Sequence, residues 1–525
     1  MRILLVYPNR DLTTRMPLGV CFISSYLKRE GHIVEAFDAT FFKREGAQND
    51  DNLRAVSLQV RNPDFKEYGV DEDKLDVYTA FERKINSFKP DFVGVSVVDP
   101  NYTLGIGLLQ RLKQKHKKIF TMMGGPTVTF APEEVIAQDC VDAICVGEGE
   151  EAVAEFCGLM GQDKDITSVK NVWIKKDNKI YRNDVRTLIN LDTLLAPDWD
   201  IFDQRHLIRP LGGKMYRMGI FSITRGCLFR CTYCANFALG EIYKDKGFLY
   251  RIRRPEAAIK EMRYYKNKYD LNFIFFVDDI FPLHKSEILE EFCYLYKKEI
   301  ALPFSVSLHA ELIKEKQFAQ LVDAGCCNVC VGLESGSQRI RQDIFERRCR
   351  DEQIINAFSL ARKYGIRSSA FNIIGIPGET RKEIFETIEL NRRANPTTTT
   401  LTFLHPYRGT KIRDLCIRAK YFDPTKERDY EKGYRMETCL NMPQVSSKTL
   451  SGIFKTFQLY FKLPKCFYPF IRLAEGNSCF ANSIFNFLKK IFYRITSKEA
   501  EWDFSLPVAR EKKLGRREWL NKTIF

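Results

Sequence analysis

Five short apolar runs alternate with stretches of helical spacing over the first 160 residues. Short, continuously apolar runs bounded by turn residues are typical of strands that are buried on both faces. The stretches Gly19–Glu30 and Val77–Phe88 repeat their apolar residues with helical periodicity. This alternation predicts a doubly wound α/β domain that binds its ligand beyond the carboxyl ends of a parallel sheet. The predicted strands are Ile3–Tyr7, Ile33–Phe37, Phe92–Val98, Ile119–Met123 and Ala143–Val146.

A second alternating series runs from about residue 218 to residue 405. Six strand–helix units in a row predict a partial (β/α)6 barrel, whose chemistry would lie at the carboxyl ends of the strands. The predicted strands are Gly219–Thr224, Phe273–Val277, Phe304–Leu308, Val329–Leu333, Ser368–Ile374 and Thr399–Leu404. We therefore expect four segments: a leading domain (1–160), a linker with a small hairpin (161–215), a barrel (216–410) and a helical C-terminal region (411–525).

The composition is that of a globular protein, with 45% hydrophobic and 28% charged residues among 525. The net charge of +15 favours anionic partners, although it is spread along the chain and only modestly concentrated in Arg510–Lys513 and Arg516–Arg517. A spread excess is more typical of a solvated surface than of a nucleic-acid face. Sixteen cysteines without a signal peptide indicate a cytoplasmic protein in which some thiols ligate metal.

The most informative segment is Thr224–Cys234, a loop after a predicted strand that carries Cys227, Cys231 and Cys234. Three thiolates can hold three irons of a cubane [4Fe-4S] cluster, which leaves the fourth iron open to a small chelating molecule. The alternative is a zinc knuckle, which needs a fourth ligand. The run Cys326–Cys330 offers further thiols, but Cys330 continues into a predicted buried strand.

This loop resembles the signature of the radical S-adenosylmethionine (SAM) superfamily, in which the open iron binds SAM and the reduced cluster cleaves it to a 5′-deoxyadenosyl radical. Motifs after three later strands, Phe275–Asp279, Gly332–Gly336 and Gly375–Thr380, resemble the SAM-binding segments of that family. The resemblance implies SAM-binding residues at Tyr233, Asp278, Asp279, Glu334, Ser335, Ile376 and Pro377. Each motif also has a structural interpretation, since Asp279 could cap a turn and Glu379 could begin a helix.

The leading domain resembles the cobalamin-binding domain that precedes many radical SAM barrels. The resemblance implies cobalamin-binding residues at Leu18, Gly19, Ser96, Gly124, Gly125, Pro126, Thr127, Gly147, Glu148, Gly149 and Glu150. The chain lacks the Asp-x-His-x-x-Gly motif, so we expect no histidine on the lower face of the cobalt. The alternative is a flavodoxin-like domain that binds another nucleotide or nothing, although no Gly-x-Gly-x-x-Gly follows the first strand.

The combined resemblance implies methyl transfer to an unactivated carbon: cobalamin would take a methyl group from SAM, and the adenosyl radical would activate the substrate. Relatives with the same parts perform cyclisation, rearrangement or oxidation, and a non-catalytic cobalamin or redox sensor is an alternative of another class. A methylthiotransferase would need a second cysteine triad, and Cys21, Cys140, Cys145 and Cys157 lack that spacing.

The expected partners are a small-molecule or lipid-like substrate and a flavodoxin, ferredoxin or reductase that supplies electrons. No substrate base can be named, although five side chains fall near the predicted mouth of the barrel: Tyr216, His309, His405, Tyr407 and Arg408. The aromatic, basic tail has three interpretations, namely core packing, a cap over the barrel, or an interfacial helix in peripheral contact with a membrane.

Overall fold

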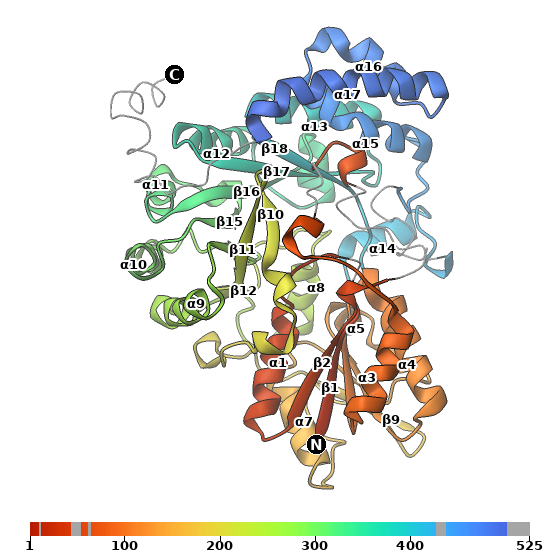
Figure 1. Cartoon of the computed structure of the whole chain (residues 1–525). Coiled ribbons are helices and arrows are strands. Elements are labelled where there is room, and N and C mark those ends of the chain that lie inside the picture. The colour runs from red at the N-terminus through yellow and green to blue at the C-terminus, as the bar shows by residue number, and fades with distance from the viewer. Residues whose placement is uncertain (10–11, 44–53, 61–64, 427–436, 501–525) are drawn as a thin grey trace.

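Two curved sheets, one from each half of the chain, form the framework of the computed structural model (Figure 1). The structure describes residues 1–9, 12–43, 54–60, 65–426 and 437–500. The basic clusters Arg510–Lys513 and Arg516–Arg517 lie outside these residues.

The first sheet has seven strands in the order β2-β1-β5-β6-β7-β8-β9, and its first five strands are parallel. Ile3 and Leu5 pack in one core with α1 and α7, whereas Leu4 and Val6 pack in another with α3 and α4. Burial of both faces explains the uninterrupted apolar runs and confirms the doubly wound fold. The parallel strands are β1 (Arg2–Tyr7), β2 (Ile33–Asp38), β5 (Phe92–Ser96), β6 (Phe120–Gly124) and β7 (Ala143–Cys145). The helices of this half are α1 (Leu18–Arg29), α3 (Val77–Phe88), α4 (Tyr102–Lys115), α5 (Pro126–Phe130), α6 (Pro132–Ile136) and α7 (Glu150–Met160).

The hairpin expected in the linker, β8 (Val172–Lys176) and β9 (Lys179–Arg182), belongs to this first sheet. β8 runs antiparallel to β7, with Ala143 opposite Ile174. The leading sheet therefore continues past residue 160. A two-stranded ribbon, β3 (Phe42–Lys43) and β4 (Asp73–Asp76), lies apart from it.

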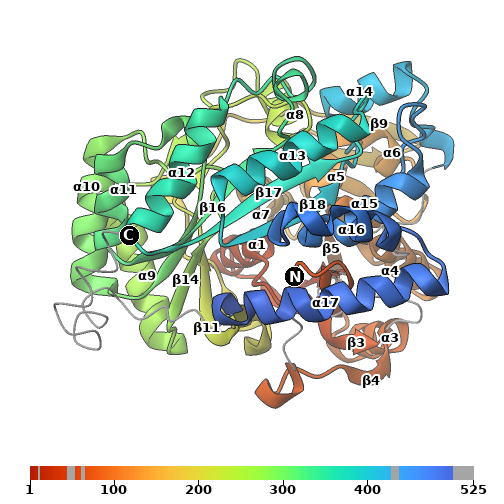
Figure 2. The ribbon, with the colours of Figure 1, turned by 90° about the horizontal axis from the view of Figure 1, so that it is seen from above.

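The second sheet has the order β10-β11-β14-β15-β16-β17-β18, and its last six strands are parallel, which confirms the partial barrel. The antiparallel β10 forms one edge and β18 the other. Figure 2 shows α9 to α13 along the outside of the curved sheet. The strands are β10 (Ile208–Leu211), β11 (Lys214–Phe221), β14 (Phe273–Phe276), β15 (Phe304–Leu308), β16 (Cys326–Glu334), β17 (Arg367–Ile374) and β18 (Thr398–Phe403). The helices are α8 (Ala235–Ile242), α9 (Pro255–Tyr269), α10 (Ser286–Leu295), α11 (Glu315–Asp323), α12 (Asp351–Lys363) and α13 (Arg381–Ala394).

Segments of the leading half bind both open edges of the partial barrel. Gln59 accepts a hydrogen bond from the edge amide of Leu401 in β18 (2.8 Å), and Leu58 is buried in the same core as Leu401. At the other edge, Thr14 donates to the carbonyl of Ile208 in β10 (3.0 Å). Because exposed strand edges are unpaired polar surfaces, these contacts stabilise the barrel while they fix the first sheet against it.

The C-terminal region is helical, as predicted, with α14 (Lys411–Arg418), α15 (Ser447–Lys462), α16 (Tyr468–Ala474) and α17 (Cys479–Ala500). Phe454 of α15 stacks on Phe403 of β18 with ring centroids 4.6 Å apart, and Gln458 hydrogen bonds with Thr399 (2.9 Å). The core-packing interpretation therefore holds for α15. Among the described residues, no helix is long and apolar enough to cross a membrane.

Candidate functional site

The cysteine loop leaves a two-stranded ribbon, β12 (Thr224–Arg225) and β13 (Arg251–Ile252), through Gly226. Gly226 has φ +82°, and a Cβ there would lie 2.3 Å from the carbonyl oxygen of Leu249, so only glycine fits. Cys227 and Cys234 are half-buried and Cys231 is buried. Cys234 lies directly before α8, so the loop and the helix are fixed together.

Each of the three sulfurs receives one nitrogen donor. The contacts are Phe229 N to Cys227 Sγ (3.5 Å), Asn236 Nδ2 to Cys234 Sγ (3.7 Å) and Arg347 Nη1 to Cys231 Sγ (4.0 Å). Burial raises the pKa of Cys227 to about 12, and the charges of Cys234, Asp279 and Cys231 raise it further against the hydrogen bond from Phe229. Thiolates this close together would repel one another. Iron binds cysteines as thiolates and would offset that repulsion, and the N–H donors at the sulfurs suit the bound form.

No group of three or more His, Cys, Asp or Glu side chains in the described part of the chain could hold a metal ion as the side chains stand. A cubane binds each thiolate at a different iron, so its three ligands need not converge on one point. The cysteine loop therefore fits the predicted [4Fe-4S] cluster, because it offers three thiols and each sulfur is approached by an N–H group.

Asp278 and Asp279 follow β14 directly beneath the cysteine loop. One oxygen of Asp278 accepts the backbone N–H groups of Ile223 and Thr224 and the Thr224 hydroxyl, so this residue braces the start of the loop. Its other oxygen, Oδ2, is buried without a partner, and burial raises the pKa of the carboxyl to about 7. Asp279 lies within electrostatic range of Cys227, and it is exposed.

Glu334 lies where β16 changes register against β17, and it has a φ of +67°. Burial raises the pKa of its carboxyl, against the charge of Arg347 and a hydrogen bond with Tyr233. Arg347 also donates to the carbonyl of Gly332 (2.8 Å) and approaches Cys231, so it connects the β16 motif to the cysteine loop. Arg347 was not predictable from the sequence, because a lone arginine after a strand carries no motif.

The predicted SAM-binding residues Ser335, Ile376 and Pro377 are all buried. Ser335 is fully buried, where its hydroxyl contacts Thr387 (3.5 Å). Ile376 is buried in the barrel core, and its N–H donates to Glu379 (3.2 Å). Glu379 does not begin a helix. Its carboxylate folds back onto the Gly375 and Ile376 amides, while α13 begins after Thr380.

The mouth residues separate into three groups. His309 stacks on Phe229 of the cysteine loop with ring centroids 3.7 Å apart, and burial with the charge of Arg347 lowers its pKa to about 2. His405 and Tyr407 contact one another after β18, and His405 also contacts Cys439 (3.7 Å). Arg408 pairs with Asp99 and Glu134 of the leading domain, so it is an interdomain residue.

The expectation for Tyr216 was wrong. Tyr216 lies near the amino end of β11 and packs on Phe273, the first residue of β14 (5.0 Å between centroids). It is therefore at the end of the barrel opposite the cysteine loop, and β11 begins five residues before the predicted strand.

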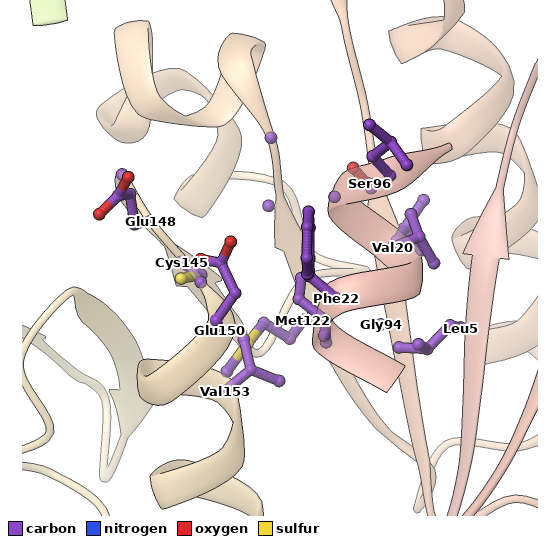
Figure 3. Close-up of a pocket in the computed structure, with 18 of the residues that line it drawn as sticks. Leu5, Val20, Phe22, Gly94, Ser96, Met122, Cys145, Glu148, Glu150 and Val153 are labelled. Atoms are coloured by element: carbon purple, nitrogen blue, oxygen red, sulfur yellow. The ribbon is translucent and has the colours of Figure 1, made fainter. Parts of the chain in front are cut away.

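A cavity of about 370 Å³ lies at the carboxyl ends of β1, β5, β6 and β7 (Figure 3). Ten of the eleven predicted cobalamin-binding residues line it; Thr127 is instead buried, with its hydroxyl donating to Asp99 (2.8 Å). Nothing lies within 4 Å of a Cβ built on Gly19, so a bulky ligand can approach the start of α1. None of the described residues that line the cavity is a histidine.

The deep wall of this cavity is apolar, which the sequence analysis did not predict. Leu5, Phe22, Met122, Cys145 and Val153 line it in Figure 3. Leu5, Met122, Cys145 and Val153 also belong to the hydrophobic core, so no sequence motif distinguishes the cavity wall from ordinary core positions. Such a wall suits the non-polar part of a large ligand, while the glycine turns and helix amino ends suit its polar edges. The cavity therefore fits cobalamin.

Glu148 and Glu150 at the rim of the cavity are bound by two arginines from β12 and β13. Arg225 donates to Glu148 (3.0 Å) and to Glu150 (2.6 Å), and Arg251 donates to both oxygens of Glu148 (2.6 and 3.1 Å). The backbone N–H of Ile189 also binds Glu148 (3.0 Å). We call these four charged side chains the rim clamp. Arg225 stands two residues before Cys227, so the rim clamp holds the cysteine loop beside the cavity.

Family comparisons agree with this geometry. Residues 14–157 match the model of the B12 binding domain, and residues 221–390 match that of the radical SAM superfamily. The first range contains every predicted cobalamin-binding residue, and the second contains every predicted cluster and SAM residue.

The chain resembles two curated relatives over most of its length. It is 26% identical to an uncharacterized methyltransferase, PH0819, of Pyrococcus horikoshii, over 79% of this chain and 83% of that protein. It is 24% identical to the anaerobic magnesium-protoporphyrin IX monomethyl ester cyclase of Rubrivivax gelatinosus, over 94% and 83% respectively. Among solved structures, the radical SAM methyltransferase TsrM of Kitasatospora setae, with cobalamin and a [4Fe-4S] cluster bound, aligns with a TM-score of 0.63 at 14% identity, over 95% of this chain and 99% of TsrM. That likeness shows a shared fold.

Proposed function

The chain joins a B12-binding domain to a radical SAM domain, and from that premise we propose that it methylates an unactivated carbon of a small-molecule or lipid-like substrate. The rim clamp carries the proposal, because it fixes the cysteine loop and the cavity side by side. When bound, the cluster and SAM would supply a 5′-deoxyadenosyl radical, and cobalamin would carry the methyl group.

The chain's own residues would position these groups and exclude water. Cys227, Cys231 and Cys234 would hold the cluster, and the half-buried Glu334 and the buried Arg347 would border SAM. His309 is neutral at physiological pH, because its pKa is lowered to about 2. Its Nδ1 accepts the Glu311 N–H (3.4 Å), so the proton lies on Nε2, which has no partner and can donate to a bound molecule. A dry, preorganised site protects a reactive primary radical from quenching.

Anaerobic reconstitution with iron, sulfide and cobalamin tests the proposal, followed by incubation with methyl-labelled SAM, a reductant and a cell extract that supplies substrate. We expect 5′-deoxyadenosine, S-adenosylhomocysteine and a labelled product. Absence of both SAM-derived products would favour the sensor alternative and contradict the proposal. Triple substitution of Cys227, Cys231 and Cys234 by alanine is the control for cluster-dependent turnover.

Cyclisation or oxidation is the second candidate function, because the match to the R. gelatinosus cyclase covers 94% of this chain. The same experiment separates the two functions. A cyclase would form 5′-deoxyadenosine without transferring label from the methyl group to a product.

A further inference from the structure

The last helix, α17, presents two adjacent apolar faces, and only one of them is packed. Ala481, Phe485, Leu488 and Phe492 are buried against the rest of the tail. About a quarter of a turn around the helix, the side chains of Phe480, Phe487 and Ile495 are 68%, 62% and 49% exposed. Ile484 and Ile491 lie between them on the same stripe, where they are partly buried and pack against the core of the tail. The stripe therefore continues over most of the helix.

The neighbouring helix α16 adds Phe470 and Leu473, which are 55% and 53% exposed and one helical turn apart. α16 and α17 lie together at the end of the molecule remote from the leading domain (Figure 1), and both are seen from above in Figure 2. We call the five residues Phe470, Leu473, Phe480, Phe487 and Ile495 the tail face. Single exposed apolar residues are normal, but a continuous exposed stripe marks an interaction surface.

The charges around the tail face are mainly basic. Residues 441–500 contain nine lysines and arginines against two glutamates, although the whole chain has an excess of only fifteen positive charges. Lys490 and Arg494 are exposed and border the apolar stripe on its unpacked side. Glu475 points inward, where it pairs with Arg381 (2.6 Å) and accepts a hydrogen bond from Tyr460 (2.6 Å). The outward charge of this end of the molecule is therefore basic.

We propose that the tail face docks the enzyme on an anionic lipid surface, with α17 in the plane of the interface. Aromatic and aliphatic side chains would enter the boundary between headgroups and acyl chains, while Lys490 and Arg494 would contact anionic headgroups. This is peripheral binding, and it stands independently of the reaction that the barrel catalyses.

Co-sedimentation of the full chain with vesicles tests the proposal. We expect binding to phosphatidylcholine vesicles that contain about one third phosphatidylglycerol, and weak binding to phosphatidylcholine alone. Serine at both Phe480 and Phe487 should reduce the bound fraction about tenfold or more. Lys490→Gln with Arg494→Gln should weaken binding severalfold and reduce its dependence on salt.

Tyr294→Ser on α10 is the matched control, because Tyr294 is an exposed aromatic residue remote from the tail, and it should bind like the parent chain. Circular dichroism melts establish that each variant folds. Equal vesicle binding by the Phe480/Phe487 variant would overturn the proposal. Absence of binding to anionic vesicles would also overturn it. That result includes the case in which light scattering shows that the tail face mediates self-association instead.

Discussion

At the residue scale, several buried carboxyl groups support the site without touching its chemistry. Glu379 is fully buried and accepts two backbone N–H groups, yet burial raises its pKa to about 8. An acid whose pKa is raised on folding favours the folded state while it is protonated. That stability is fully present below the unfolded pKa of about 4.5 and is lost as the pH rises through about 8.

Glu379→Gln should therefore flatten the pH dependence of stability. Between pH 5 and pH 8.5 we expect the parent chain to lose roughly 2–4 kcal/mol of unfolding free energy from this group, and the variant to lose less. Urea unfolding at the two pH values measures the difference. Glu383→Gln is the control, because hydrogen bonds led by that of Arg339 outweigh burial and lower the pKa of Glu383 to about 2. Glu383 therefore titrates below pH 5, and this variant should keep the pH slope of the parent chain. An identical pH slope for Glu379→Gln and the parent would contradict this assignment.

Gly226 is a second residue-scale determinant, since its positive φ and the nearby Leu249 carbonyl exclude any side chain. Gly226→Ala should introduce about 1–3 kcal/mol of strain at the start of the cysteine loop and lower the iron retained after reconstitution severalfold. Gly240→Ala in α8 is the matched control, because nothing lies within 4 Å of its added Cβ. Iron and sulfide analysis measures both, and equal iron in the two variants would refute the argument.

At the scale of elements, the rim clamp joins β12 and β13 to the start of α7. Glu148→Gln would leave Arg225 and Arg251 with less countercharge in a largely buried setting. We expect a loss of roughly 2–4 kcal/mol in unfolding free energy and weaker retention of cobalamin. Thermal unfolding and the cobalamin absorbance of gel-filtered protein measure these effects. Glu151→Gln, at an exposed glutamate in the first turn of α7, is the control and should change neither quantity.

The strands and the site residues were predictable from the sequence to different degrees. The strands and the three cysteines were predictable, because each depends on a local pattern. A strand buried on both faces is a continuous apolar run, and the cluster cysteines lie close together in the sequence. Arg225, Arg251 and Arg347 were not found, because their partners lie across a domain boundary or after another strand. Tyr216 was misplaced, because a residue at or before the amino end of a barrel strand lies away from the mouth, which is formed by the carboxyl ends.

At the scale of the whole molecule, one hydrophobic core crosses the boundary between the two halves. Leu5 and Phe156 of the leading domain belong to the same buried cluster as Trp199, Ile220 and Phe276. The contacts of Gln59 and Thr14 at the barrel edges add to this continuity. A shared core predicts cooperative unfolding of the two halves.

We therefore expect one urea transition, with the same midpoint by far-ultraviolet circular dichroism and by tryptophan fluorescence. Trp173 reports on the leading sheet, and Trp199 reports on the packing of the linker against α9. Variants that retain only one of these two described tryptophans would separate their signals. Two transitions with distinct midpoints would show that the halves fold independently.

The central claim is that the chain holds a [4Fe-4S] cluster and cobalamin next to one another across the rim clamp. Electron paramagnetic resonance of the anaerobically reconstituted and reduced protein tests it most directly, because a reduced cluster and cob(II)alamin each carry an unpaired electron. The account predicts that each signal is broadened by the other, and that the broadening disappears when the three cluster cysteines are replaced by alanine. Two sharp signals, each indifferent to the presence of the other cofactor, would contradict it.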